Sequence, residues 1–200
     1  MIALIGESGS GKSSIEKELI DRFGYEKVIL HTTRPMRNEE EQDRDYHFCG
    51  EWEFKVRESQ NEYILTSNFN EWYYGLPQII DDDIADNSVI VLTPKCMRQL
   101  KSVSVRNLCT FYINVPRRDR FIRSLHRGDD IEEVYRRSLS DIGQFDGVKG
   151  ECDFEIKNFL NSDGLNFTRT LYQISDLIDL QYKGYLTNKN IKNEDNKLKR

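Results

Sequence analysis

A glycine-rich stretch near the start of the chain has the residue types and spacing to bind a chain of phosphates. Residues 6–13 read GESGSGKS and fit the pattern GxxxxGK[ST], with an apolar run before them and a helix-like segment after them. Glycines let successive backbone N–H groups turn toward one anion, and the N-terminus of the following helix adds its dipole. Lys12 can reach the β- and γ-phosphates of a nucleoside triphosphate, and the Ser13 hydroxyl can ligate Mg²⁺. The expected ATP-binding residues are Gly6, Glu7, Ser8, Gly9, Ser10, Gly11, Lys12, Ser13 and Ser14.

A second group of anion-binding residue types follows in the segment HTTRPMR. Arg34 and Arg37 stand on either side of a proline, on a loop that leaves a predicted strand. Guanidinium groups suit bidentate phosphate binding. Hydroxyl groups that could add hydrogen bonds belong to Thr32, Thr33, Tyr46 and Tyr74. By itself this pattern is weak, because paired surface arginines are more often simply solvated.

The elements that must position these residues alternate between buried strands and helices. Residues 2–5 (IALI) predict a buried strand, and Ser13–Phe23 predicts an amphipathic helix that ends at Gly24. Further strands are expected at 27–33, 88–93, 109–115 and 154–158, and further helices at 79–86, 96–102 and 168–182. This alternation is typical of an α/β fold with a parallel sheet.

Two stretches interrupt the alternation and predict inserted parts. The first, about 34–80, has a charged loop followed by aromatic segments typical of antiparallel strands. The second, about 117–145, is arginine-rich, helical and broken near Gly128. We therefore expect one domain over 1–182 and a flexible polar tail over 183–200. Within that domain the core takes about 1–33, 81–116 and 146–182, and the two inserted parts lie between these segments.

The overall composition limits the class of protein. Hydrophobic residues make up 38% and charged residues 32%, which is a globular balance. The net charge of −5 argues against general nucleic-acid binding, which needs a basic face. No run approaches the roughly 18 apolar residues of a membrane span. The four cysteines lack metal-ligand spacing. We expect a cytoplasmic protein with small-molecule partners and neither nucleic acid nor membrane.

The order of the motifs adds a resemblance. The glycine-rich loop, TTRPMR, DYHF, YYG, INVPRRDRFIRSLHRGD and CDFEIKN occur in a sequence that resembles the guanylate kinase family over roughly residues 2–180. The resemblance implies a P-loop three-layer α/β core, an inserted lobe that binds a nucleoside monophosphate, and an arginine-rich lid. It also implies transfer of the γ-phosphoryl group of ATP to GMP or dGMP, with Mg²⁺.

The resemblance further implies roles for particular residues. Arg34, Arg37, Tyr46 and Tyr74 would hold the acceptor phosphate, with Thr33 and Gly75 in the same site. Arg123 and Arg127 would come from the lid, and a third lid residue would be Arg137 in preference to Arg136. Asn158 would lie near these arginines and the nucleotide. The expected catalytic residues are Lys12, Arg34, Arg123, Arg127 and Arg137, which align and neutralise two anions without a strong base.

The positions that would read guanine depart from the family pattern. Leu65 stands where the family has a glutamate, Leu76 where it has a small hydroxyl residue, and Thr93 or Pro94 where it has an acidic residue. A leucine cannot accept hydrogen bonds from guanine. Our hypothesis is that guanine is still preferred and is read by the backbone or by a replacement side chain. The candidate side chains belong to Asn68, Asn70, Glu71, Asp81 and Asp82.

Other functions stay open on the sequence alone. One is a kinase of the same fold for another nucleotide or a sugar phosphate, which the turn Tyr74-Gly75-Leu76-Pro77 would suit. Another is a non-enzymatic interaction module, although such modules have typically lost the glycine-rich loop. A third is a P-loop ATPase that binds nucleic acid, which the acidic net charge disfavours.

Overall fold

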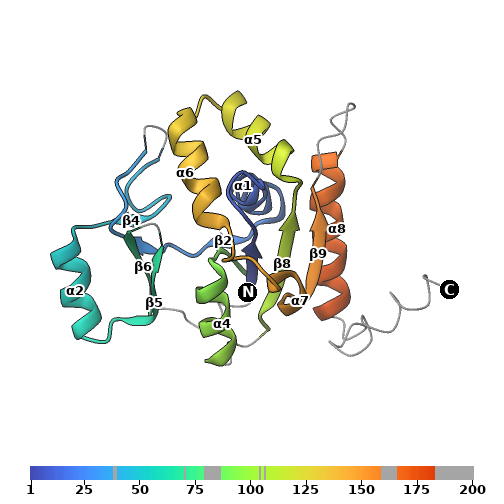
Figure 1. The fold of residues 1–200 in the computed structure, drawn as a ribbon. Helices are drawn as coiled ribbons and strands as arrows, with labels where there is room; N and C mark the ends of the chain where they lie inside the picture. The colour runs from blue at the N-terminus through green and yellow to red at the C-terminus, as the bar shows by residue number, and fades with distance from the viewer. Residues whose placement is uncertain are drawn as a thin grey trace.

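A parallel five-stranded sheet forms the centre of the computed structural model, which describes residues 1–37, 40–69, 71–78, 87–103, 105, 107–158 and 166–182. Its strand order is β2-β7-β1-β8-β9 (Figure 1). The strands are β1 (Ile2–Ile5), β2 (Glu26–Lys27), β7 (Ser88–Val91), β8 (Cys109–Asn114) and β9 (Phe154–Lys157). All the pairings within this sheet are parallel. The predicted α/β fold with a parallel sheet is therefore confirmed.

Helices cover both faces of this sheet, because alternate residues of each strand point to opposite sides. Ile2 and Leu4 of β1 pack toward helices α1 (Lys12–Phe23) and α8 (Asn166–Tyr182). Ala3 and Ile5 pack in a second core cluster with helix α4 (Pro94–Ser102). Figure 1 shows α8 and α4 in separate layers about the sheet. The three-layer core follows from strands that are apolar at every position rather than at every second one.

A second sheet of four strands forms a lobe beside the core, on the left in Figure 1. Its order is β4-β3-β6-β5, and its strands are β3 (His31–Thr32), β4 (His47–Phe48), β5 (Tyr63–Phe69) and β6 (Trp72–Pro77). β5 and β6 pair antiparallel, as the aromatic segments predict. The lobe also contains helix α2 (Glu51–Ser59), which the sequence analysis did not predict.

The prediction of one strand over 27–33 was wrong. β2 ends at Lys27 and pairs with β7 of the core, whereas β3 pairs with β4 and β6 of the lobe. Leu30, between them, is buried in the core cluster around α4. A single straight strand could not join both sheets, so the chain leaves one sheet before it enters the other. The predicted helix at 79–86 and the tail at 183–200 lie outside the described residues.

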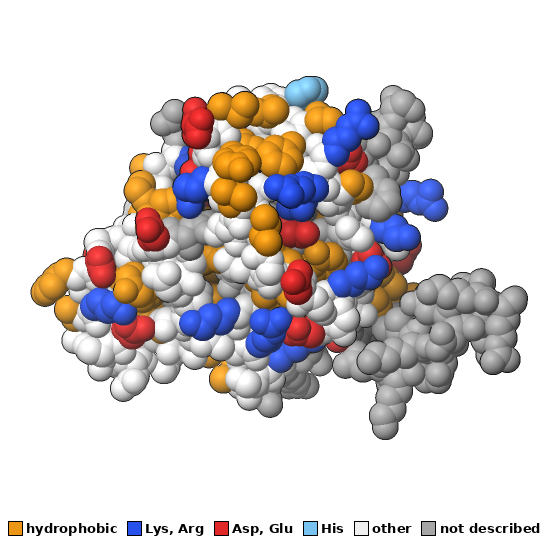
Figure 2. Space-filling model, viewed as in Figure 1, with side chains coloured by type: hydrophobic (Ala, Val, Ile, Leu, Met, Phe, Trp, Pro, Cys, Tyr) orange, Lys and Arg blue, Asp and Glu red, His pale blue; other side chains and the backbone are white. Residues whose placement is uncertain are grey.

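The arginine-rich segment folds as two helices, as predicted, and a short helix follows them. These are α5 (Arg117–His126), α6 (Ile131–Asp141) and α7 (Val148–Glu151), and the break between α5 and α6 includes Gly128 at a φ of 84°. α5 and α6 lie across the top of the molecule in Figure 1, beside α1. We call α5, α6 and the turn between them the lid. In Figure 2, apolar side chains gather over the lid, where Leu125, Ile131, Tyr135, Leu139 and Ile142 are exposed. None of the described helices is long and apolar enough to cross a membrane.

Candidate active site

The glycine-rich loop connects β1 to α1, and close packing explains its glycines. Gly9 and Gly11 have φ values of 77° and 91°, which side chains rarely adopt. A Cβ atom at Gly9 would lie 2.8 Å from the Arg120 carbonyl oxygen, and one at Gly11 would lie 2.9 Å from Asn158 Nδ2. Glycine at these positions thus allows both the turn of the loop and the close approach of neighbouring segments.

Lys12 stands at the start of α1 and faces back into its own loop. Its Nζ donates to the carbonyl oxygens of Gly6 at 2.7 Å and Glu7 at 3.0 Å. Burial lowers the pKa of Lys12 to about 8, although the nearby charges of Asp141 and Glu7 act in the opposite direction. An anion that replaced these carbonyl contacts would therefore meet a lysine whose ammonium group is poorly hydrated.

A cavity of about 220 Å³ joins this loop to the predicted second anion site. Its loop side is lined by Gly6, Ser8, Gly9, Lys12 and Ser13. The lobe and the loop that enters it contribute Arg34, Arg37, Tyr46 and Tyr74, and the lid contributes Arg127 and Arg137. These predicted residues come from segments far apart in the chain. The fold brings them around one space, with cationic groups on its opposite walls.

A carboxylate that the sequence analysis missed organises the arginines of the second site. Arg34 is buried, and its guanidinium donates to Glu40 Oε1 at 2.8 Å and Oε2 at 2.9 Å. The Arg37 N–H donates to Glu40 Oε2 at 2.9 Å. Burial opposes ionisation of Glu40, but these hydrogen bonds outweigh it and hold its pKa below the usual value. Tyr46 lies under the Arg34 guanidinium, 5.3 Å from ring centre to Cζ.

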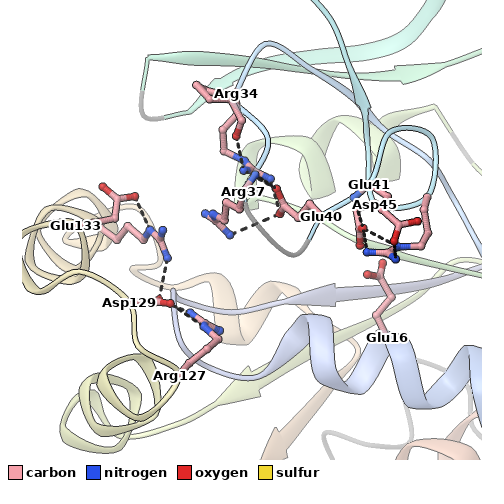
Figure 3. A network of polar contacts seen from close by, with 12 residues as sticks. Glu16, Arg34, Arg37, Glu40, Glu41, Asp45, Arg127, Asp129 and Glu133 are labelled. Atoms are coloured by element: carbon pink, nitrogen blue, oxygen red, sulfur yellow. Dashed lines mark hydrogen bonds and ion pairs between the residues drawn. The ribbon is translucent and has the colours of Figure 1, made fainter.

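The arginines of the lid are paired in a similar way by Asp129. Arg127 and Arg137 both contact Asp129 Oδ2, Arg137 at 3.3 Å. Arg137 also donates to Glu133 Oε1 at 2.7 Å. Figure 3 shows these lid groups across from Arg34, Arg37 and Glu40. Two pairs of arginines thus line the cavity, and each pair is bound to a carboxylate. A phosphate in the cavity could compete with that carboxylate for the arginines.

The structure separates the two candidates for the third lid arginine. Arg137 lines the cavity. Arg136 lies over the Trp72 ring of the lobe, at 5.2 Å from the ring centre, and pairs with Glu133. This placement agrees with the preference for Arg137, whose role in transfer stays a prediction.

Two predicted residues lie behind the loop rather than at the cavity. Arg123 Nη1 donates to the Ser10 carbonyl oxygen at 3.2 Å, and its Nη2 donates to the Asn158 carbonyl oxygen at 2.5 Å. The buried Asn158 Nδ2 donates to the same Ser10 oxygen at 3.1 Å. In this arrangement Arg123 and Asn158 brace the loop from outside. Their contact with the nucleotide stays a prediction.

Four further predicted residues have structural contacts or lie away from the cavity lining. The Thr33 hydroxyl accepts from the Tyr73 N–H at 2.9 Å. This bond connects β6 to the start of the loop that carries Arg34 and Arg37. Glu7 accepts from the Tyr112 hydroxyl at 2.8 Å. Ser10 is buried, and Ser14 is exposed on α1. These residues shape the loops around the cavity.

Gly75, whose place in the acceptor site stays a prediction, packs against aromatic rings inside the lobe. A Cβ atom there would lie 2.8 Å from ring carbons of Tyr63 and 3.1 Å from the Phe54 ring. We expect Gly75→Ala to lower the free energy of unfolding by about 1–3 kcal/mol, because a methyl group would overpack the stacked rings. Chemical denaturation would measure this. Gly50→Ala is the matched control, since nothing lies within 4 Å of its Cβ position. Equal stability of the two variants would contradict the packing explanation.

The part of the cavity away from the arginines is largely apolar. Its lining includes Leu30, Phe69, Val91, Leu92, Cys96 and Phe145. Leu65 and Leu76 are buried in the core cluster next to this wall. The Thr93 hydroxyl also lines the cavity, but it already caps α4 by accepting from the Cys96 N–H at 3.3 Å. Among the described residues of this wall, few polar groups are therefore left to bind a base.

Of the five residues proposed to replace the missing base contacts, the structure describes two, and neither is among the cavity-lining residues. Asn68 and Glu71 are exposed near the turn between β5 and β6. Asn70, Asp81 and Asp82 lie outside the described residues. The hypothesis that one of them reads guanine therefore stays a prediction.

Sequence reasoning missed the acidic residues of the site, Glu40, Asp129 and Asp141. Each follows a predicted arginine closely: Glu40 after Arg37, Asp129 after Arg127, and Asp141 one helical turn after Arg137. That proximity was an available signal for Glu40 and Asp129, which pair with the arginines near them in sequence. Asp141 instead contacts Arg120 and Ser8.

Comparisons with known proteins agree with this geometry. The sequence model of the family described as "Guanylate kinase" matches residues 1–165. A guanylate kinase of Prochlorococcus marinus subsp. pastoris is 29% identical over 162 residues, which cover 79% of this chain and 88% of that protein. One of Baumannia cicadellinicola is 31% identical over 141 residues, covering 66% and 69%. The guanylate kinase structure from Anaplasma phagocytophilum superposes with a TM-score of 0.65 over 90% of this chain and 85% of that one. At 18% identity this last match shows the shared fold.

Proposed function

Because this chain belongs to the guanylate kinase family, we propose that it transfers the γ-phosphoryl group of ATP to GMP or dGMP, giving ADP and (d)GDP. The observation that carries the proposal is the cavity with Lys12 on one side and Arg34 and Arg37 on the other. Two anion sites that share one space can hold a donor and an acceptor phosphate close together. A nucleotide switch or a simple hydrolase would need only the first site.

The proposed mechanism depends on alignment and charge. Phosphoryl transfer has a loose transition state whose negative charge lies on the equatorial oxygens. Lys12 would stabilise the β- and γ-phosphates, and Arg34 and Arg37 would hold the acceptor phosphate in line. Arg127 and Arg137 would cover the transferring group from the lid and exclude water. Substrate phosphates would compete with Glu40 and Asp129 for these arginines.

Mg²⁺ is the cofactor that the family implies, and the loop offers one suitable ligand. The Ser13 hydroxyl lines the cavity beside Lys12 and is a hard oxygen donor of the kind that Mg²⁺ prefers. A Mg²⁺ ion held by Ser13 would supply positive charge that offsets the negative charge developing on the phosphates. Phosphate oxygens and water would complete its coordination, because no acidic residue ends β7 in this chain.

A kinase of the same fold with another acceptor is the second candidate. The apolar wall formed by Leu30, Phe69 and Leu92 favours it, because the described residues of this wall offer guanine few hydrogen-bond partners. A base with fewer polar edge groups than guanine would lose fewer hydrogen bonds there, whereas the sugar-phosphate alternative depends on the turn Tyr74-Gly75-Leu76-Pro77. Both candidates use the same arginines, so phosphate binding cannot distinguish them. The proposed substrates are small molecules found in the cytoplasm, which is the location we propose.

Steady-state kinetics with ATP and a panel of acceptors tests the proposal. The panel contains GMP, dGMP, AMP, UMP, dTMP and a sugar phosphate. We expect GMP and dGMP to have the highest kcat/KM. Equal activity on all acceptors, or none on GMP, would overturn the guanine preference. ATP binding without transfer to any acceptor would instead favour the non-enzymatic interaction module.

The pKa of Lys12 gives a further prediction about ATP binding. Burial lowers this pKa to about 8, and only the protonated amine attracts phosphate. Binding above pH 8 therefore requires uptake of a proton, so the association constant should fall by up to about tenfold for each further pH unit. Calorimetry between pH 7 and 9.5 would measure this change in the association constant for ATP. Lys12→Arg stays charged throughout, so its ATP affinity should lack this fall. A wild-type affinity that did not change over this range would contradict the prediction.

A further inference from the structure

Asp141 is a buried carboxylate beside the glycine-rich loop that the proposed mechanism does not use. It is the last residue of α6 and is 6% exposed. Its Oδ2 accepts from the Ser8 N–H at 2.8 Å, and the Ser8 hydroxyl donates to Oδ1 at 3.4 Å. Burial raises the pKa of Asp141 above its usual value, although these hydrogen bonds and the charge of Lys12 oppose the rise. An ionised carboxylate at this place therefore costs stability, which points to a role other than stabilisation of the fold.

Arg120 of α5 meets the same part of the loop from the other lid helix. Its Nη1 lies 3.6 Å from Asp141 Oδ2 and donates to the Ser8 carbonyl oxygen at 3.5 Å. Its Nη2 lies 3.5 Å from Glu7 Oε1. The two backbone polar groups of Ser8 are thus contacted by the two helices of the lid. The Asp141–Arg120 pair joins these contacts into one clamp.

The helical spacing connects this clamp to a predicted catalytic residue. Asp141 follows Arg137 by one turn of α6, so the two side chains lie on the same face of the helix. Both line the cavity. The contacts that hold Asp141 against the loop therefore also fix the position of the helical turn that carries Arg137, both around and along the axis of α6. Ion pairs with Glu133 and Asp129 orient Arg137 within the lid, but neither of these reaches the loop.

We propose that Asp141 is a positioning residue that docks α6 on Ser8 and thereby places Arg137 at the transferring phosphoryl group. The inference rests on the proposed kinase function. It assigns the coupling between α6 and the loop to this side chain. The competing possibility is that the carboxylate merely occupies the phosphate site and must be displaced by ATP.

Kinetics of variants at this position test the proposal. Asp141→Ala should lower kcat by about 10- to 100-fold, since a small misplacement of an aligned group has effects of this size. The dissociation constant for ATP should stay within about threefold. Asp141→Asn should retain more activity, because its amide oxygen can still accept from the Ser8 N–H although the ion pair with Arg120 is lost. Glu132→Gln, an exposed charge on the same helix, is the matched control and should match the unaltered protein.

A double variant separates positioning from general structural damage. If Asp141 acts through Arg137, adding Asp141→Ala to Arg137→Ala should lower kcat little further. Full additivity of the two losses would overturn the proposal. So would an unchanged kcat, or tighter ATP binding with kcat unchanged, which is the result expected of a phosphate competitor. Failure of the unaltered protein to bind ATP and transfer phosphate would overturn the proposed function, and this inference with it.

Discussion

Replacing Lys12 with alanine should lower kcat by about a thousandfold or more, which corresponds to roughly 4 kcal/mol of transition-state stabilisation. The ammonium group is the cation of the loop, and it lies in the cavity wall with its charge only partly hydrated. Removing it leaves the developing charge on the β- and γ-phosphates without this partner. It also removes the Nζ contacts to the Gly6 and Glu7 carbonyl oxygens, so the loop loses part of its internal support.

Initial rates with ATP and GMP would measure this loss. Lys17→Ala is the matched control, because Lys17 is on the same helix but is exposed and pairs with Asp21 at the surface. We expect it to retain nearly full activity. If Lys12→Ala stayed within tenfold of the unaltered protein, the assignment of residues 6–13 as the ATP phosphate site would be refuted.

Replacing Arg34 with alanine should lower kcat/KM for the acceptor by about a thousandfold, while the ATP dissociation constant changes little. Arg34 is 5% exposed, and its fork is held by Glu40 in the geometry that suits a phosphate. Truncation would remove the fork and also leave the Glu40 carboxylate with Arg37 as its remaining cation. The loop that carries Arg34 and Arg37 would then lose a phosphate-binding group and also the ion pair with Glu40 that helps to hold its conformation.

Two further variants make this result specific. Arg34→Lys keeps the charge but not the bidentate fork, so we expect an intermediate loss of about ten- to a hundredfold. Arg44→Ala removes an exposed arginine from the same loop, where it pairs with Glu41 and Asp45 on the surface, and should act like the unaltered protein. An equal loss in Arg34→Ala and Arg44→Ala would indicate a general charge effect rather than an acceptor site.

The parts of the fold that sequence predicted well have strong local signals. β1 is an unbroken apolar run, and α1 has Ile15 and Leu19 on one face and ends at Gly24 in the left-handed conformation. α2 gave no such signal. Phe54 is its one fully buried side chain, and Trp52 is exposed. A helix that buries so little lacks the apolar periodicity from which helices are predicted.

The split of the strand predicted over 27–33 shows a different limit. Lys27 and His31 both belong to extended segments, so propensity could not distinguish one strand from two. The division depends on which partner each segment meets: β7 for Lys27 and β6 for His31. The partner strands lie far away in the chain, so the sequence of a segment does not show which strand it will pair with.

By itself the sequence determined the kind of chemistry, because glycine-rich spacing, Lys12 and the paired arginines are local patterns with a direct physical meaning. The tertiary structure alone decided which charges face one another. It placed Glu40 and Asp129 between arginines, turned Arg123 toward the back of the loop, and set Asp141 against Ser8. It also packed Gly75 against the rings of Tyr63 and Phe54. These outcomes depend on contacts between distant segments, whose geometry is fixed only when the core, the lobe and the lid pack together.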